Sequence, residues 1–136
     1  MLAELLVLLV LAGACTAILA MKVLTPVKSP ADATHDYLEA IKTGNTAAAF
    51  GLLCRPSRKG LTPAKFAQGV AEERRTNGAV TRYRVVATFV ESGGKARARY
   101  TLTTTKRVGT VEARLEKEGG DWKLCDFREV GPSTPN

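Results

Sequence analysis

Apolar residues divide the chain into an N-terminal apolar segment, three helical stretches and a run of strands. Residues 1–24 include 20 apolar residues, and no charge lies between Glu4 and Lys22. Because about 20 apolar residues span the roughly 30 Å hydrocarbon core of a bilayer, residues 1–24 are predicted to form a transmembrane helix. Residues 25–30 follow as a linker.

A cleaved N-terminus is the alternative interpretation of the same segment. Small residues precede Cys15, and residues 11–15 resemble a lipoprotein cleavage site in which Leu11 lies one place too far from the cysteine. The first residues also lack the Lys or Arg of a signal peptide, and apolar residues resume after Cys15. We therefore favour an uncleaved anchor, with a cleaved lipoprotein lipidated at Cys15 as the alternative.

Helical spacing characterises the chain from Ser29 to Gly78. Residues 29–32 (Ser-Pro-Ala-Asp) fit a capping box with proline in the first turn, and Gly44 fits a C-terminal cap. Asn45 can cap a short second helix that runs to Cys54, and residues 62–77 predict a third. Residues 55–60 are expected to form a polar turn.

After Gly78 the apolar period changes from helical to two. Alternation predicts strands over residues 82–89, 95–102 and 110–115, with a fourth over 122–130. Residues 131–136 are polar and are expected to be a disordered tail. The order of elements predicts an α+β fold, in which an N-terminal transmembrane helix precedes three helices packed on a curved antiparallel sheet of about four strands.

Composition narrows the class of protein. The chain has 136 residues, 45% of them hydrophobic, and a formal charge of +7, which excludes a disordered, collagen-like, coiled-coil or multi-span membrane protein. One His and three Cys are too few for a usual structural zinc site, so no metal or cofactor is expected. The core is lean, because 14 of the 41 hydrophobic residues after Leu24 are alanine.

A thin core under a curved sheet often leaves a pocket. The aromatic residues expected to line it are Tyr37, Phe66, Tyr83, Phe89, Tyr100 and Trp122.

Cations occupy the polar positions of two neighbouring strands. This basic face consists of Arg82, Arg84, Lys95, Arg97 and Arg99. Its simplest interpretation is a solvated sheet face whose charges also resist edge pairing. The functional interpretation is contact with anionic lipid, an envelope polymer or an acidic partner. Nucleic acid is not expected, because no aromatic residues are expected on that face, no recognition motif is present and a membrane anchor is predicted.

The residues also resemble a known family. The resemblance is carried by Gly44-Asn45, by Leu52-Leu53-Cys54 at the end of an Ala-rich helix, by Leu61-Thr62-Pro63, and by Gly119-Gly120-Asp121-Trp122-Lys123-Leu124-Cys125. Together they resemble the nuclear-transport-factor-two-like superfamily, which has a cystatin-like, cone-shaped α+β fold, and especially its small membrane-anchored or lipoprotein members from actinobacteria. The resemblance covers residues 31–130 and implies a conical cavity.

The resemblance and the membrane segment together imply a Cys54–Cys125 disulfide. In a reducing compartment both cysteines would be small buried residues. Outside the cytoplasm a bridge would join the helices to the sheet, at about 4 kcal/mol on the loop-entropy model. Lys22 and Lys28 weakly favour a cytoplasmic domain, but we give the cysteines more weight and expect a single-pass protein of the cell membrane with an extracytoplasmic domain.

The superfamily includes isomerases and dehydratases that abstract a proton inside the cone. The expected inward strand positions here carry no carboxylate or histidine, and His35 and Asp36 are adjacent on a helix, so they cannot both face one cavity. We therefore expect no enzyme, but a binding or accessory subunit of a cell-envelope membrane complex with a membrane-protein partner. A small-molecule carrier or an isomerase-like enzyme is the alternative.

Overall fold

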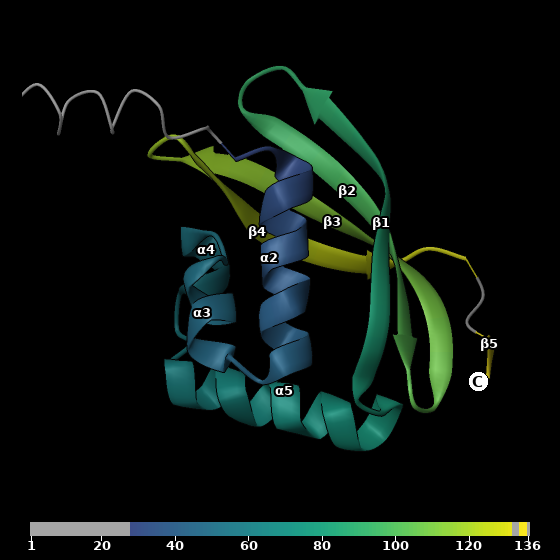
Figure 1. The fold of residues 1–136 in the computed structure, drawn as a ribbon. Coiled ribbons are helices and arrows are strands. Elements are labelled where there is room, and N and C mark those ends of the chain that lie inside the picture. The colour runs from purple at the N-terminus through teal and green to yellow at the C-terminus, as the bar shows by residue number, and fades with distance from the viewer. Residues whose placement is uncertain (1–27, 132–133, 136) are drawn as a thin grey trace, which may run out of the picture.

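The computed structural model describes residues 28–131 and 134–135. These residues form helices α2 (Pro30–Thr43), α3 (Thr46–Gly51), α4 (Arg55–Arg58) and α5 (Pro63–Asn77), followed by strands β1 (Val80–Glu91), β2 (Lys95–Thr104), β3 (Arg107–Glu118), β4 (Asp121–Glu129) and β5 (Thr134–Pro135) (Figure 1). The predicted transmembrane helix over residues 1–24 lies outside the described residues. Among the described helices, none is both long enough and apolar enough to cross a bilayer.

The helices begin where the sequence predicts. Ser29 and Asp32 form the capping box of α2, and Gly44 ends this helix at φ 78°. The Asn45 side chain accepts a hydrogen bond from the backbone of α3, as Thr62 does for α5. The prediction that the second helix reaches Cys54 was wrong, because α3 ends at Gly51 and the next residues run beside β4.

The polar turn predicted over residues 55–60 is in part a helix. Residues 55–58 form the single turn α4, with Pro56 in its first turn, where the missing amide hydrogen costs nothing. The tail prediction also needs correction, since Thr134 and Pro135 pair with Val108 and Arg107 at the start of β3.

The sheet is an antiparallel meander in the order β1-β2-β3-β4, as predicted, with β5 added beside β3. Three register shifts interrupt it, two between β1 and β2 and one between β3 and β4. One makes Val86 an extra residue of β1, because Val85 pairs with Tyr100 and Ala87 with Arg99. A bulge of this kind changes which side chains face which side of the sheet.

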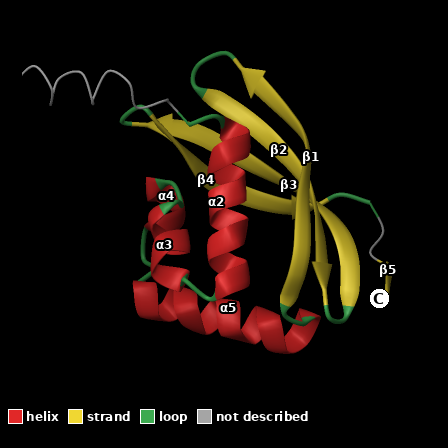
Figure 2. Ribbon diagram, in the orientation of Figure 1, coloured by secondary structure: helices red, strands yellow, loops and turns green. Residues whose placement is uncertain are grey.

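The helices cover one side of the curled sheet and leave the other side uncovered in the described part of the chain (Figure 2). Three buried alanines, Ala96, Ala98 and Ala113, lie under the helical layer. Their small side chains let the helices approach the strands closely. Larger buried residues complete the core, namely Leu38, Leu53, Tyr100, Leu115, Trp122 and Leu124.

The disulfide Cys54–Cys125 joins the helical layer to the last strand, as the resemblance implies. The two Cα atoms are 5.0 Å apart. Cys125 is the extra residue at the register shift between β3 and β4, where Arg114 pairs with Asp126 and Leu115 with Leu124. The backbone beside it is also paired, since Cys54 N donates to Leu124 O (2.8 Å) and Leu124 N to Leu52 O (2.9 Å). The segment after α3 thus extends the sheet by a short parallel pairing.

Candidate binding cavity and basic face

A cavity of about 600 Å³ lies between α2, α5 and the concave side of the sheet. Its walls are mainly apolar. The apolar lining includes Leu38, Ile41, Ala67, Val70, Val80, Leu102, Val111 and Phe127, together with the rings of Tyr37 and Tyr100. A volume of this size is within the usual range for small-molecule sites. The cavity is therefore the strongest candidate site in the described structure.

Aromatic packing fixes one wall of the cavity. The rings of Tyr37 on α2 and Phe127 on β4 are stacked with centroids 5.2 Å apart. Burial raises the pKa of Tyr37 to about 12, and burial also raises the pKa of Tyr100. Both phenols are therefore protonated at neutral pH and can donate a hydrogen bond, but neither can act as a base there.

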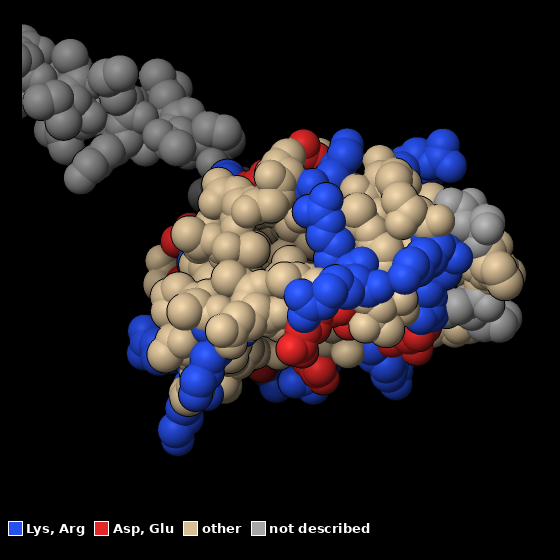
Figure 3. All heavy atoms as spheres, turned by 90° about the horizontal axis from the view of Figure 1, so that it is seen from below, with Lys and Arg blue, Asp and Glu red and all other residues tan. Residues whose placement is uncertain are grey.

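Charged side chains gather at the rim. Lys42 on α2 and Arg74 on α5 line the cavity, are exposed, and make no ion pair with any other described residue. Arg107 pairs with Glu129 and donates to Asn77 Oδ1 at 3.1 Å. Seen from the α5 side, Lys and Arg side chains gather on one half of this end of the molecule, and the other half is mostly uncharged (Figure 3).

Only some of the predicted aromatic lining residues reach the cavity. Tyr37 and Tyr100 do, whereas Phe66 contacts Phe50 at a centroid distance of 5.7 Å and Trp122 is buried in the core. Phe89 was placed on the wrong side of the sheet. The bulge at Val86 shifts the alternation, so Phe89 lies opposite Arg97 and is 44% exposed.

Two carboxylates in the cavity wall were missed by the sequence analysis. Glu73 comes from α5 and Glu129 from the end of β4. Glu129 pairs across the sheet with Val111, because the bulge at Cys125 changes the phase of β4 after the predicted alternation. The Glu73 side chain accepts a hydrogen bond from Asn77 Nδ2 at 2.5 Å. The helical spacing of α5 could have indicated Glu73, since Val70 and Asn77 lie on the same face.

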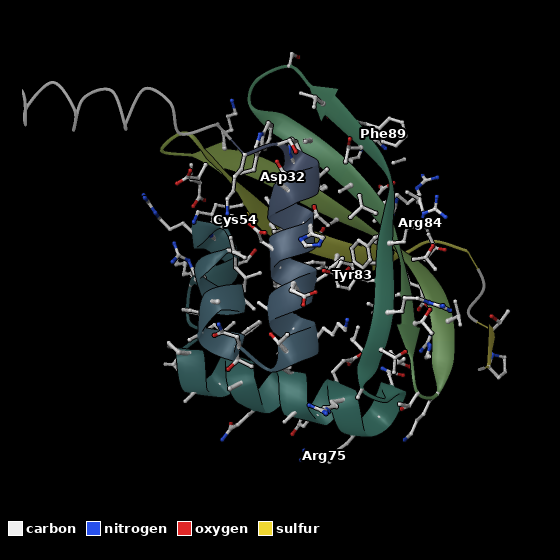
Figure 4. The ribbon with its side chains drawn as sticks, in the orientation of Figure 1. Asp32, Cys54, Arg75, Tyr83, Arg84 and Phe89 are labelled. Carbon is white, nitrogen blue, oxygen red and sulfur yellow. A yellow bond between two sulfur atoms is a disulfide. The ribbon has the colours of Figure 1, made fainter. Side chains whose placement is uncertain are left out.

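A second, shallower groove contains Tyr83. This side chain points from β1 toward α2 (Figure 4), where its hydroxyl donates to Glu39 Oε2 at 2.5 Å and lies 3.0 Å from His35 Nε2. Desolvation, and then the hydrogen bond to Glu39, raise the pKa of Tyr83 to about 12. His35 lies in this groove and not in the cavity, and Asp36 pairs with Lys28 at 2.5 Å. The contacts of Tyr83 with His35 and Glu39 thus join β1 to α2.

The basic face lies on the uncovered side of the sheet. The register places Arg82, Arg84, Lys95, Arg97 and Arg99 on this side, and Arg114 and Arg128 join them from the next two strands. Arg84 and Phe89 point away from α2 (Figure 4). All five predicted cations therefore lie on one side of the sheet.

Glu112 organises the centre of the basic face. Its side chain is 6% exposed and contacts three guanidinium groups, from Arg99 at 3.1 Å, Arg128 at 3.2 Å and Arg97 at 3.9 Å. The hydrogen bond from Arg99 and the nearby arginines hold the pKa of Glu112 below its usual value. The negative charge of Glu112 thus offsets the repulsion among the three neighbouring guanidinium groups.

This pairing predicts a pH-dependent contribution to stability. A carboxyl group whose pKa is lower in the folded chain than in the unfolded chain stabilises the fold. For Glu112 this stabilisation is complete above the unfolded pKa of 4.5, and it is lost as the pH falls through the folded pKa. We expect Glu112→Gln to lower the thermal midpoint at pH 7, and the difference from the unmodified protein to shrink below pH 4.5. Thermal melts followed by circular dichroism, at pH 7 and at a pH below 4.5, measure this difference in midpoint.

The matched control is Glu116→Gln on the same strand, because the Glu116 carboxylate makes no ion pair with the described residues. It should change the midpoint little at either pH. A Glu112→Gln effect of equal size at both pH values would show that the charge of Glu112 contributes nothing.

Comparisons with known proteins identify the fold. Neither a family model nor a curated protein matches the sequence. Among solved structures, a SEC-C motif-containing protein from Rhodopseudomonas palustris matches with a TM-score of 0.61 at 13% identity, over 86% of this chain and 89% of that one.

Two further matches are NTF2-like, which is the short form of nuclear-transport-factor-two-like. A protein from Campylobacter jejuni with a provisional transpeptidase name matches with a TM-score of 0.57 at 16% identity, over 73% of this chain and 99% of that one. A protein of unknown function from Cytophaga hutchinsonii matches with a TM-score of 0.53 at 16% identity, over 79% and 94%. At such low identity the shared property is the arrangement of elements. Residues 28–131 therefore have the NTF2-like α+β fold, with helices packed inside a curled antiparallel sheet.

Proposed function

We propose that this protein is a membrane-anchored, non-enzymatic binding subunit whose cavity holds an amphipathic molecule with an apolar body and an anionic head. The observation that carries the proposal is the cavity of about 600 Å³ with apolar walls and with Lys42 and Arg74 at its rim. Apolar walls favour burial of hydrocarbon. Cations without an internal partner can bind a carboxylate or phosphate at the edge of the solvent.

The protonation of the cavity residues supports binding over catalysis. The phenols of Tyr37 and Tyr100 hold their protons at neutral pH, because burial raises the pKa of each. The two carboxylates in the wall already accept hydrogen bonds, Glu73 from Asn77 and Glu129 from Arg107. A proton-abstracting isomerase or dehydratase needs a base aimed at the substrate, and these contacts aim both carboxylates at protein groups.

The location of the protein is part of the proposal. The apolar residues 1–24 would hold the chain in the cell membrane, and the Cys54–Cys125 bridge fits an oxidising compartment outside the cytoplasm. The resemblance of the sequence to membrane-anchored and lipoprotein members of the superfamily in actinobacteria is part of the same proposal. In such a place the domain would serve as an accessory subunit of an envelope complex and present its ligand to a membrane-protein partner.

The rim cations provide a test with a matched control. Arg74 and Arg75 are neighbours on α5, but only Arg74 lines the cavity, and Arg75 points away below the helix (Figure 4). We expect Arg74→Ser to reduce occupancy by an anionic probe roughly tenfold, since a charge-assisted hydrogen bond contributes about 1.5–3 kcal/mol. Arg75→Ser should leave occupancy unchanged.

The measurement uses the full chain in phospholipid nanodiscs and a fatty acid with a photoreactive diazirine in its hydrocarbon chain. After irradiation, mass spectrometry identifies the labelled peptides. Labelling of α5 and β3 at low probe concentration reports occupancy of the cavity. Equal loss of labelling in both variants would show that Arg74 binds no head group and that only the general positive charge matters.

A further inference from the structure

The uncovered side of the sheet combines guanidinium groups with exposed apolar side chains. Arg82 and Arg84 on β1 make no ion pair with other described residues. On the next strands, Arg97, Arg99 and Arg128 are held around the buried carboxylate of Glu112. This arrangement leaves a fixed group of cations facing solvent.

Apolar side chains accompany these cations along β1. Phe89 is 44% exposed, and the guanidinium of Arg97 lies 5.3 Å from the centre of its ring. Val86, the extra residue of the bulge, is 49% exposed. Solvation of the charged face does not account for an exposed phenylalanine beside an arginine. Basic and aromatic side chains together suit the boundary of a bilayer, where phosphates lie next to hydrocarbon.

We infer that the basic face, with Phe89, docks on the anionic surface of the bilayer. The inference rests on the proposed anchor, because the five residues 25–29 between it and α2 span at most about 17 Å and would keep the domain beside the membrane. Guanidinium groups of Arg82 and Arg84 bind lipid phosphates, and Phe89 enters the interfacial layer. A hydrated polyanion would satisfy the arginines but would leave Phe89 in water, so lipid fits this face better.

The test places an environment-sensitive fluorophore at Phe89. Phe89→Cys is made in a Cys15→Ser background and labelled with a nitrobenzoxadiazole probe, while the Cys54–Cys125 bridge keeps the other cysteines unreactive. The full chain is reconstituted in nanodiscs of phosphatidylcholine, alone or with phosphatidylglycerol. We expect the probe emission to shift to the blue only with phosphatidylglycerol, and the shift to decline as salt is raised. The same probe at Gln68→Cys, an exposed site on α5, should not respond.

Arg82→Ser with Arg84→Ser should abolish the shift without changing the thermal midpoint, because neither arginine makes an ion pair with a residue that the structure describes. Three outcomes would overturn the inference: no shift with phosphatidylglycerol, a shift that survives this double substitution, or a shift that appears only when a soluble polyanion is added.

The anchor is tested separately by washing membranes with alkaline carbonate, which removes surface-bound proteins. A chain that floats with anionic vesicles through this face but is released by carbonate would sustain the docking face and refute the anchor.

Discussion

Replacing both Cys54 and Cys125 by serine is expected to destabilise the domain by about 3–4 kcal/mol and to lower its thermal midpoint by about 15 °C. The bridge closes a loop over a sequence separation of 71 residues, so its loss gives the unfolded chain a large gain in conformational freedom. It also fixes the segment after α3 against β4, where Leu53 and Leu124 are paired. Circular dichroism of the full chain in detergent measures the midpoint.

The state of the thiols provides the control for this prediction. In a Cys15→Ser background, alkylation of the purified protein should modify no cysteine until a reductant is added. Cys54→Ser alone should leave Cys125 reactive. Free Cys54 and Cys125 in protein whose native redox state was trapped before lysis would contradict the bridge. The orientation would then depend on Lys22 and Lys28, which favour a cytoplasmic domain.

Local sequence signals predicted most of the helical layer. Capping residues act within one turn of their own helix, so Ser29, Gly44 and Asn45 could be interpreted without knowledge of the rest of the chain. The end of the second helix could not be predicted in this way. It depends on the pairing of residues 52–54 with β4, a contact between residues about seventy positions apart.

The bulges at Val86 and Cys125 explain most of the errors in the candidate site. Alternation assigns side chains to a face only while the register is continuous. The extra residue Val86 moved Phe89 out of the expected lining, and the extra residue Cys125 turned Phe127 and Glu129 toward the cavity. Nothing in the local sequence marks either position, since neither contains glycine. The side on which Arg97 and Arg99 lie follows the simple alternation, because β2 has no register shift against β3.

Blocking the cavity is expected to have the largest effect on binding. Val70 lines the cavity from α5 and is only partly buried, so Val70→Trp can place an indole in the open space without displacing the core. We expect a loss of more than about tenfold in occupancy, because the bulky ring removes apolar surface that the ligand would otherwise bury. Gln68→Trp adds the same ring at an exposed position of the same helix and should have no effect.

Photolabelling of these two variants by the diazirine fatty acid is the most direct test of the binding cavity. The unmodified chain and Gln68→Trp should be labelled on cavity residues such as Leu102 and Val111, and Val70→Trp should lose this labelling while its thermal midpoint stays the same. Undiminished labelling of Leu102 and Val111 in Val70→Trp, or labelling confined to residues outside the cavity in all three proteins, would contradict the proposal that the cavity holds an amphipathic ligand.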